Sequence, residues 1–577
     1  MKIILAQQNY LIGDFEGNLQ KIITGIEEAK KQQADLVVFS ELCLCGYPPR
    51  DFLEFEDFIL QGEQGLERLK PYSADIGLLV GAPCRNPTPE GKDLFNAAWL
   101  LFEGEIRATV HKSCLPTYDI FDEYRYFEPA FHWEVIPFKG KKLAVTICED
   151  IWNLGDDPLY RICPMDELMA QQPDVMINLS ASPFDYDQRE KRLAVIRANV
   201  KKYRLPMFYC NAVGAQTEMI FEGGSLIMDG EGTVIRQLPE FAEALDGCTL
   251  ESLQSAPMSR EKTAEEQESS QAPLHPATGN MPALTRSQNA RLPFDADRHI
   301  ARIHDAVVLG IRDYFDKMQF STAILGSSGG IDSAVALCLA ATALGPDHVH
   351  AVLMPSAFSS DHSVADARDL SARLGTPCEV LPIKEIYDAF LHTLAPHFGN
   401  LPFGLAEENI QARSRGNLLM ALANKFGHIL VNTSNKSELA TGYGTLYGDM
   451  AGGLSVLGDI YKTQVYALAR YINRNREIIP EAILTKAPSA ELRPGQKDSD
   501  SLPDYTVLDP ILYQYIEHRQ GPQEIIAQGH DPALVHRILR LVNTNEYKRN
   551  QFCPIIRVSP KAFGAGRRVP IVGKYLS

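Results

Sequence analysis

Residues 324–337 read ILGSSGGIDSAVAL, and this stretch decides the fold of the second half of the chain. An apolar run typical of a buried strand leads into a loop of glycine and serine, and an alanine-rich helical pattern follows. Glycines let a backbone approach a phosphate and present its N–H groups, and a helix beginning near Ser333 adds a positive dipole end. Asp332 offers carboxylate oxygens of the kind that Mg²⁺ prefers. The stretch therefore predicts a phosphate-binding loop between a strand and a helix.

Two other interpretations of this loop are available. A Walker-type loop is excluded, because its lysine falls where this chain has Ile331 or Asp332. A plain glycine–serine turn that caps a helix, with Asp332 or Ser333 as the N-cap, remains open on local composition.

The sequence around the loop alternates between strands and helices. From about residue 295 we expect helices over 296–317, 333–343 and 361–374, between strands in the segments TAILG, VHAVLMP, CEVLPI and HILVNT. Alternation of this kind predicts a doubly wound parallel sheet with helices on both faces.

The first half of the chain has its own alternation. Buried strands are expected in KIILAQQ, DLVVFSE, IGLLVGAP, LAVTICED, DVMINLSA and MFYCNAVG, with helices over 17–33 and 187–203. Two hairpins are expected in NAAWLLFEGEIRATVHK and SLIMDGEGTVIRQL, where Glu-Gly or Asp-Gly supplies the turn. Residues 240–293 are rich in Ser, Glu, Gln, Ala and Pro without a sustained period, which predicts a linker or surface excursion between domains 1–239 and 294–577.

Composition narrows the class of protein. A chain of 577 residues is too long for one core, and 45% hydrophobic and 22% charged residues are ordinary for a globular protein. The net charge of −17 disfavours a general nucleic-acid or membrane binder. The eleven cysteines form no CxxC pair, the start of the chain lacks a signal-peptide core, and no window is long enough to span a membrane. We therefore expect a cytoplasmic protein.

The loop resembles a known nucleotide-binding motif. SGGxDS after a strand resembles the PP-loop of the N-type ATP pyrophosphatases, and residues 431–471, VNTSNKSELATGYGTLYGDMAGGLSVLGDIYKTQVYALARY, resemble the signature of the NAD synthetases. The resemblance implies an adenine nucleotide alpha hydrolase-like fold for 294–577. In short, ammonia-using members a lysine stands where this chain has Leu446, whereas longer two-domain members share the TLYGDMAGG form, so this departure favours the latter.

The same resemblance implies binding residues. For ATP these are Gly326, Ser327, Ser328, Gly329, Gly330, Ile331, Asp332, Ser333, Thr433, Lys462 and Ser489; for deamido-NAD they are Asn409, Glu438 and Lys548. Asp332 and Glu438 would also hold Mg²⁺, and this is coherent, since both follow strands that we expect to be neighbours.

Three residues of the first half each follow an apolar strand: Glu41, Lys112 and Cys148. Attack by a cysteine on an amide needs a base for the thiol proton, a donor for the oxyanion and a positive field, and these residues fill those roles. Taken singly, each has a plainer interpretation as a helix cap, a surface charge or a packing residue.

With their flanking sequences the three resemble the Glu–Lys–Cys set of the nitrilase/amidase superfamily. The resemblance implies an α-β-β-α sandwich, a supporting role for Glu123, and glutamine contacts from Tyr118, Ser182 and Gln188. The last contact is usually Lys or Arg, and Arg189 stands beside Gln188, so which of the two faces glutamine stays open.

Both halves together resemble the glutamine-dependent NAD synthetases. This implies ATP-dependent amidation of deamido-NAD through an adenylate, with ammonia from glutamine and with AMP, pyrophosphate and glutamate as products, in a homo-oligomer that is a dimer or larger. Two alternatives are an amidotransferase of this type with another acceptor, and a nucleotide or nitrogen sensor without activity. The presence of Asp332, Glu438 and Cys148 disfavours the sensor.

Overall fold

The computed structural model describes residues 1–155, 158–253, 293–489 and 491–576. These residues divide into two compact units. The first contains Met1–Ser182, Arg189–Gly214 and the described residues from Phe221 to 253. The second contains Pro183–Gln188, Ala215–Ile220 and the described residues from 293 onward.

Two stacked sheets form the centre of the first unit. One has the strand order β14 (Ala244–Thr249), β1 (Lys2–Gln7), β2 (Leu36–Val38), β3 (Gly77–Arg85), β4 (Leu94–Phe102) and β5 (Glu105–His111). The other has the order β13 (Val234–Gln237), β12 (Leu226–Met228), β9 (Met207–Asn211), β8 (Val175–Ser180), β7 (Lys141–Ile147) and β6 (Ile136–Phe138). Strands β1, β2 and β3 run parallel, as do β7, β8 and β9.

Side-chain alternation explains the layering, because successive residues of a strand point to opposite faces. Ile177 of β8 joins a buried cluster with residues of the other sheet, such as Leu5 and Leu79. Its neighbour Met176 packs instead with Ile196 of α4 (Gln188–Tyr203). Strand β8 is thus buried on both faces, as its apolar run predicted.

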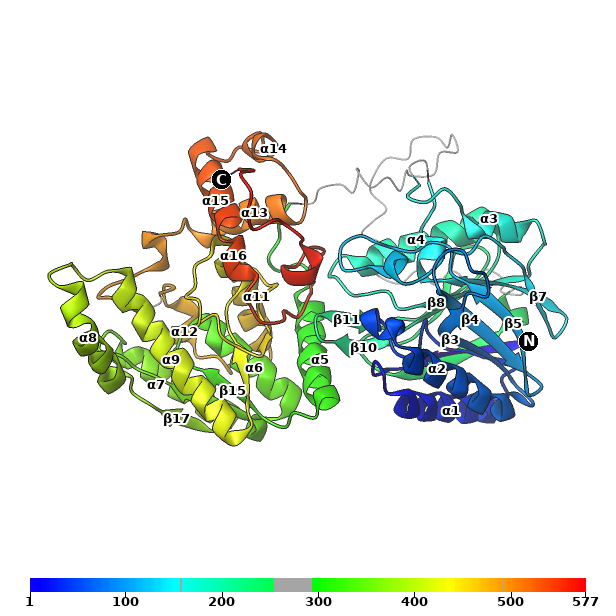
Figure 1. Cartoon of the computed structure of the whole chain (residues 1–577), viewed down its shortest axis with the longest axis horizontal. Helices are drawn as coiled ribbons and strands as arrows, with labels where there is room; N and C mark the ends of the chain where they lie inside the picture. Colours follow the sequence, from blue (N-terminus) through cyan, green and yellow to red (C-terminus); the bar gives the residue numbers. More distant parts are fainter. Residues whose placement is uncertain (156–157, 254–292, 490, 577) are drawn as a thin grey trace. The chain divides into compact units, whose positions relative to one another are not determined.

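Helices cover the outer faces of both sheets. Helices α1 (Phe15–Lys31) and α2 (Glu56–Leu69) lie on one side, and α3 (Pro164–Met169) and α4 on the other (Figure 1). The α-β-β-α sandwich is confirmed. Helices α1 and α4 match the predicted helices to within two residues, and both predicted hairpins form, as β4–β5 and β12–β13.

Part of the segment that was expected to be a linker has regular structure. Residues 244–249 of the segment 240–293 form β14, which pairs antiparallel with β1 from Lys2↔Thr249 to Gln7↔Ala244, and η5 (Leu250–Leu253) follows. Assigning these residues to a linker was wrong, because β14 is a short edge strand whose mixed polarity carries no strong period. The rest of the segment, 254–292, lies outside the described residues.

A parallel sheet organises the second unit. Its order is β17 (Cys378–Val380), β16 (Val349–Leu353), β15 (Ala323–Gly326), β18 (Ile429–Asn432) and β19 (Leu454–Ser455). All neighbouring pairs are parallel, which confirms the doubly wound arrangement. Helix α6 (Ile331–Leu344) packs against α5 (Ile300–Met318) and α11 (Lys462–Ile472), while α9 (Leu405–Phe426) contacts β15 and β18.

The remaining helices complete this unit. They are α7 (Asp361–Leu374), α8 (Lys384–Phe398), α10 (Lys436–Thr441), α12 (Glu481–Thr485), α13 (Tyr505–Ile516), α14 (Pro522–Ile526), α15 (Pro532–Thr544) and α16 (Glu546–Arg549). Helix α7 has the predicted bounds. A buried apolar cluster joins α10, α13 and α15. Within the described residues, no helix is long and apolar enough to cross a membrane.

Two segments from the first half of the sequence belong to the second unit. One is Pro183–Gln188; the other is Ala215–Ile220, in the hairpin of β10 (Val213–Gln216) and β11 (Met219–Glu222). Tyr186 N–H donates to the Val558 carbonyl at 2.9 Å, and Ala215 N–H donates to Asp313 at 2.6 Å.

Candidate active sites

Strand ends position the three candidate catalytic residues of the first unit. Glu41 lies three residues after β2, Lys112 directly follows β5, and Cys148 directly follows β7. All three side chains are buried. Cys148 begins η4 (Cys148–Ile151) with a φ of +42°, a left-handed conformation that a non-glycine residue adopts at a local cost.

Lys112 is the centre of this site. Its Nζ lies 2.7 Å from Glu41 Oε1 and 2.8 Å from both carboxylate oxygens of Glu123. Glu41 is held further by Asn96 Nδ2 at 2.7 Å and by the Ala181 N–H at 3.0 Å. The structure thus brings the predicted Glu–Lys pair together and adds Glu123, the expected supporting residue, as a direct partner of the lysine.

Burial and charge set the protonation of this site. Burial raises the pKa of the Cys148 thiol, Glu41 raises it further, and Lys112 opposes them. Burial also raises the pKa of Glu123 to about 7, against the pull of Lys112. Burial alone would lower the pKa of Lys112, but Glu123 and Glu41 outweigh it and raise that pKa. The arrangement therefore holds a neutral thiol beside a carboxylate base and a permanent cation, which suits proton transfer coupled to nucleophilic attack.

The predicted glutamine-binding residues fall in different surroundings. Tyr118 is partly exposed, and its hydroxyl donates to Glu149 Oε1 at 2.8 Å. The buried Ser182 donates its N–H to Asn211 Oδ1 at 2.8 Å. Gln188 is the first residue of α4 and ends the segment that belongs to the second unit, whereas Arg189 pairs with Glu240 at 3.1 Å.

Sequence reasoning missed Glu149, which directly follows Cys148. It is buried, it accepts hydrogen bonds from Tyr118 and Tyr160, and burial raises its pKa to about 7. Asn96, which orients Glu41, was also missed. The acidic run CED after the strand was the available signal for Glu149, and Asn96 had none, because it sits in mid-strand 55 positions from its partner.

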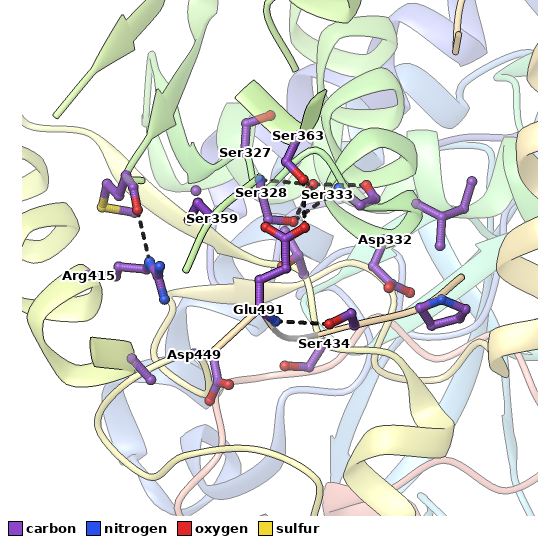
Figure 2. A pocket seen from close by; sticks show the side chains of 18 of the residues that line it. Ser327, Ser328, Asp332, Ser333, Ser359, Ser363, Arg415, Ser434, Asp449 and Glu491 are labelled. Carbon is purple, nitrogen blue, oxygen red and sulfur yellow. Dashed lines mark hydrogen bonds between the residues drawn. The ribbon is translucent and has the colours of Figure 1, made fainter. Parts of the chain in front are cut away.

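In the second unit, a cavity of about 290 Å³ lies at the carboxyl ends of β15 and β18. It is lined by the predicted ATP-binding residues Gly326, Ser327, Ser328, Gly330, Ile331, Asp332, Ser333, Thr433, Lys462 and Ser489, and by Glu438. Figure 2 shows Ser327, Ser328, Asp332 and Ser333 around it. Of the predicted loop residues, Gly329 alone is not among the lining residues.

The local conformation of the loop explains its glycines. Gly329 has a φ of +76°, and a Cβ there would lie 2.2 Å from the Ser363 carbonyl oxygen. Ser333 Oγ lies 3.2 Å from the Ser328 N–H and donates to the Gly330 carbonyl at 3.0 Å. Ser327 Oγ is buried and has no hydrogen-bond partner among the described residues. The loop is thus closed by serine contacts, with one hydroxyl left for a ligand.

Lys462 lies between the two predicted metal ligands. Its Nζ contacts Asp332 Oδ2 and lies 3.7 Å from Glu438 Oε1. Burial raises the pKa of Glu438 to about 8, and Asp332 adds to the shift. Asp498 contributes further negative charge here. Three carboxylates therefore face one lysine. The described residues include no group of three or more His, Cys, Asp or Glu side chains arranged to hold a metal ion.

A capping residue links Asp332 to α10, the helix that carries Glu438. Asn435, the N-cap, accepts from the Glu438 N–H at 3.0 Å and donates to Asp332 Oδ1 at 2.9 Å. The next residue, Lys436, is fully buried and pairs with Asp459 at 2.9 Å and Glu517 at 2.8 Å. Tyr186, from the segment Pro183–Gln188, donates to the same Glu517. Buried ion pairs therefore fix the helix that presents Glu438.

Two predicted dinucleotide-binding residues lie elsewhere. Asn409 accepts from the Thr445 hydroxyl at 2.8 Å, and Lys548 Nζ donates to the Gly442 and Gly444 carbonyls at 2.7 and 2.8 Å. Both contact the loop after α10, and neither lines the cavity. The cavity does include five charged residues that sequence reasoning missed: Arg415, Asp449, Lys486, Glu491 and Asp498.

Comparison with known proteins gives matches over both units. The carbon-nitrogen hydrolase family model matches residues 2–257, and the NAD synthase family model matches residues 303–552. A glutamine-dependent NAD(+) synthetase of Synechocystis sp. is 44% identical over 577 residues, with 99% of this chain and 98% of the relative covered. One from Acinetobacter baylyi is 41% identical, with coverage of 99% and 98%. Among solved structures, that of a glutamine-dependent NAD+ synthetase from Acinetobacter baumannii in complex with ADP is 36% identical, with a TM-score of 0.72 and coverage of 99% and 98%.

Proposed function

The chain belongs to the glutamine-dependent NAD(+) synthetases, and from this premise we propose how its two sites divide the ATP-dependent amidation of deamido-NAD with nitrogen from glutamine. We assign glutamine hydrolysis to the site around Cys148, within 1–239, and amide synthesis to the cavity around Asp332, within 294–577. The observation that carries this division is that each unit holds a separate buried site of the matching chemistry.

In the first site, the Cys148 thiol attacks the amide carbon of glutamine while Glu41 takes the thiol proton. Lys112 stabilises the oxyanion, and the protonated nitrogen leaves as ammonia. The resulting thioester is hydrolysed to glutamate when Glu41 activates a water molecule. Tyr118 and Ser182, with Gln188 or Arg189, bind the amino-acid end of glutamine.

In the second site, the nicotinate carboxylate of deamido-NAD attacks the α-phosphorus of ATP, and pyrophosphate leaves. Ammonia then attacks the acyl carbon of the adenylate, and AMP leaves with formation of NAD. Ser327, Ser328, Gly330 and Ser333 bind phosphate oxygens through N–H and hydroxyl groups, with Thr433, Lys462 and Ser489 as further ATP contacts. Asn409, Glu438 and Lys548 contact deamido-NAD.

Mg²⁺ fits this site. Asp332 and Glu438 supply carboxylate oxygens, and the excess of carboxylates over the single Lys462 leaves room for positive charge. When bound, the ion supplies charge neutralisation for the triphosphate. Asp332 and Glu438 would hold the ion, and Lys462, which lies beside both carboxylates, would contact a phosphate oxygen.

Variants that lose NAD synthesis from one nitrogen source but not from the other test this assignment. We expect Cys148→Ala to lower the rate of NAD formation from glutamine by more than about 1,000-fold. Synthesis from ammonia should stay intact, because only the hydrolysis of glutamine needs the thiol nucleophile. Asp332→Asn impairs both sources, since ATP is used in each. Steady-state NAD formation with glutamine or ammonia measures this, with Cys84→Ala as the matched control for loss of a thiol. Equal loss of both activities in Cys148→Ala would contradict separate sites.

One alternative function differs only in the acceptor of the nitrogen. An amidotransferase of the same type that acts on another carboxylate would keep both sites but would show ATP–pyrophosphate exchange with that acid and none with deamido-NAD. The exchange reaction with deamido-NAD as sole acceptor separates the two.

We also propose a homo-oligomer of two or more copies in the cytoplasm. Leu401, Phe403 and Leu405, at the start of α9, are 75%, 48% and 71% exposed, an apolar surface suited to a protein partner. All eleven cysteines are free thiols, as in a reducing compartment. Light scattering of the purified protein gives the copy number, and a monomer mass would rule out the oligomer.

A further inference from the structure

The nucleotide cavity has a charged wall that the proposed function leaves unused. It is formed by Lys486 and Glu491, in the loop after α12, and by Ser363, near the start of α7. Ser360, the N-cap of α7, is hydrogen-bonded to Glu491, and we call these four residues the Glu491 cluster. Lys486, Glu491 and Ser363 line the same cavity as the glycine-rich loop.

In this cluster the Glu491 carboxylate accepts four hydrogen bonds. Glu491 Oε1 accepts from Lys486 Nζ at 2.9 Å, Ser363 Oγ at 2.8 Å and Ser360 Oγ at 3.2 Å, and Oε2 accepts from the Ser360 N–H at 3.4 Å. Lys486 Nζ also contacts Ser363 Oγ. One cation, two hydroxyls and the N-terminus of a fourteen-residue helix make the donor set that a phosphate group needs.

The cluster is continuous with the phosphate-binding loop. Ser363 is the residue whose backbone lies against Gly329, where a Cβ would come within 2.2 Å of its carbonyl oxygen. In Figure 2 the Glu491 side chain points toward Ser363, Ser328 and Ser333. Ser327 is an independent indication that this cavity binds a polar ligand. It lines the cavity and is only 4% exposed, and its hydroxyl has no hydrogen-bond partner among the described residues.

The Glu491 carboxylate is ionised in this position. Burial alone would raise its pKa, but the hydrogen bonds from Lys486 and Ser363 outweigh burial and lower that pKa. A second anion in the same cavity would be repelled by this charge and would find Lys486 already paired. Glu491 and a polyphosphate therefore compete for one set of donors.

We propose that Lys486, Ser360 and Ser363 form a subsite for the terminal phosphates of ATP and for the leaving pyrophosphate, and that the Glu491 carboxylate fills this subsite until nucleotide displaces it. The proposal deepens the proposed function and rests on it for the identity of the polyphosphate. Lys486 and Ser363 exchange a carboxylate for phosphate oxygens, so their hydrogen bonds are kept, while Glu491 moves out into solvent.

Displacement has a measurable consequence for affinity. When only a fraction of the molecules has the subsite open, the apparent dissociation constant of the ligand is the intrinsic constant divided by that fraction. Removing the charge of Glu491 raises the open fraction and tightens binding. Removing the charge of Lys486 weakens binding, because the ligand loses a charge-assisted hydrogen bond.

The test uses the full-length protein, Mg²⁺ and calorimetric titration with inorganic pyrophosphate, and with AMP as a ligand that lacks terminal phosphates. We expect Lys486→Met to weaken pyrophosphate binding by about 10- to 100-fold and Glu491→Gln to tighten it by about 3- to 10-fold, with AMP affinity unchanged in both. Lys384→Met and Glu477→Gln are matched controls, since these residues form exposed ion pairs with Asp388 and Arg373 away from the cavity. Neither control changes the affinity for pyrophosphate.

The double variant Lys486→Met/Glu491→Gln separates direct binding from packing. If Lys486 binds phosphate, its loss still weakens pyrophosphate binding in the Glu491→Gln background; if it only holds Glu491, the effect disappears and the subsite is rejected. Weaker pyrophosphate binding in Glu491→Gln, or equal losses for AMP and pyrophosphate in Lys486→Met, would also overturn it. A wild-type protein that binds pyrophosphate through Lys486 but forms no NAD from deamido-NAD would refute the proposed function and leave the subsite standing.

Discussion

Cys148 is followed by two buried acidic residues, Glu149 and Asp150. Asp150 accepts from the N–H groups of Ser113 and Cys114 at 3.0 and 2.8 Å, so it fixes the backbone directly after Lys112. Glu149 has only tyrosine hydroxyls as side-chain partners, at 2.8 and 3.2 Å. A carboxylate next to the nucleophile with no cationic partner of its own among the described residues is suited to the α-ammonium group of glutamine.

Glu149→Gln therefore weakens glutamine binding. We expect the KM for glutamine to rise by about tenfold or more, because an ion pair at the substrate ammonium is lost. Burial raises the pKa of Glu149 to about 7, so the carboxylate form gains population as the pH rises from about 6 to about 8. The wild-type KM for glutamine should fall over that range, and the KM of Glu149→Gln should lack this fall.

Steady-state kinetics across that pH range measure the effect. The exposed Glu167→Gln on α3 serves as control, and ammonia-driven synthesis should be unchanged in both variants. An identical pH dependence in wild type and Glu149→Gln would remove Glu149 from glutamine binding.

Among individual residues, the functional candidates that could be predicted are those that follow strands recognisable in the sequence. Glu41, Lys112, Cys148 and the glycine-rich loop all follow strands, so their position at strand ends was predictable. That Cys148 comes from a different sheet than Glu41 and Lys112 was not predictable. Lys486 and Glu491 were not, because their partners on α7 lie more than 120 positions away and the loop between them has no periodic pattern. The pairing of Lys462 with both predicted metal ligands likewise depends on the buried placement of α10.

At the scale of elements, the turn between β15 and α6 depends on one glycine. Gly329→Ala places a Cβ 2.2 Å from the Ser363 carbonyl oxygen in a left-handed backbone, so the loop, α7, or both must shift. We expect kcat/KM for ATP to fall by about 100-fold with either nitrogen source, equivalent to about 2.7 kcal/mol. Initial rates at varied ATP with ammonia as nitrogen donor measure this.

Gly375→Ala is the matched control for that element. Gly375 ends α7 with a φ of +79°, and no atom lies within 4 Å of the position that a Cβ would take there. This substitution should cost about 1 kcal/mol of folding stability and leave the KM for ATP unchanged. Equal effects of the two substitutions on ATP use would mean that backbone strain alone, and not the contact with Ser363, governs the loop.

Helices and strands with a clear hydrophobic pattern were predictable from the sequence, and those without such a pattern were not. Parallel strands such as β8 and β9 are apolar and fully buried, and α7 has the predicted bounds. Strand β14 has the sequence ALDGCT, which includes polar residues and is only partly buried at the edge of its sheet. Its partner β1 lies more than 230 residues away, a distance over which local pattern gives no information.

At the scale of the whole molecule, each unit has its own core and its own proposed ligands. Ligand binding stabilises the folded state of the unit that binds it, by about 2.7 kcal/mol at 100 times the dissociation constant. In scanning calorimetry of Cys148→Ala, glutamine should raise the melting temperature of one transition and Mg²⁺-ATP that of the other, each by several degrees. A single transition that both ligands move together would show that the units unfold as one.

The pairing of β14 with β1 bears on how the protein is made. During synthesis the N-terminal strand emerges first, and its outer edge has no partner until residues 244–249 have left the ribosome. For that interval an exposed strand edge is a template for unwanted pairing with other nascent chains. Slowing of translation shortly after these codons, or a chaperone that covers the edge, would therefore favour the yield of native protein. The segments Pro183–Gln188 and Ala215–Ile220 must wait longer still, because they pack with residues that are translated later, such as Val558 and Asp313.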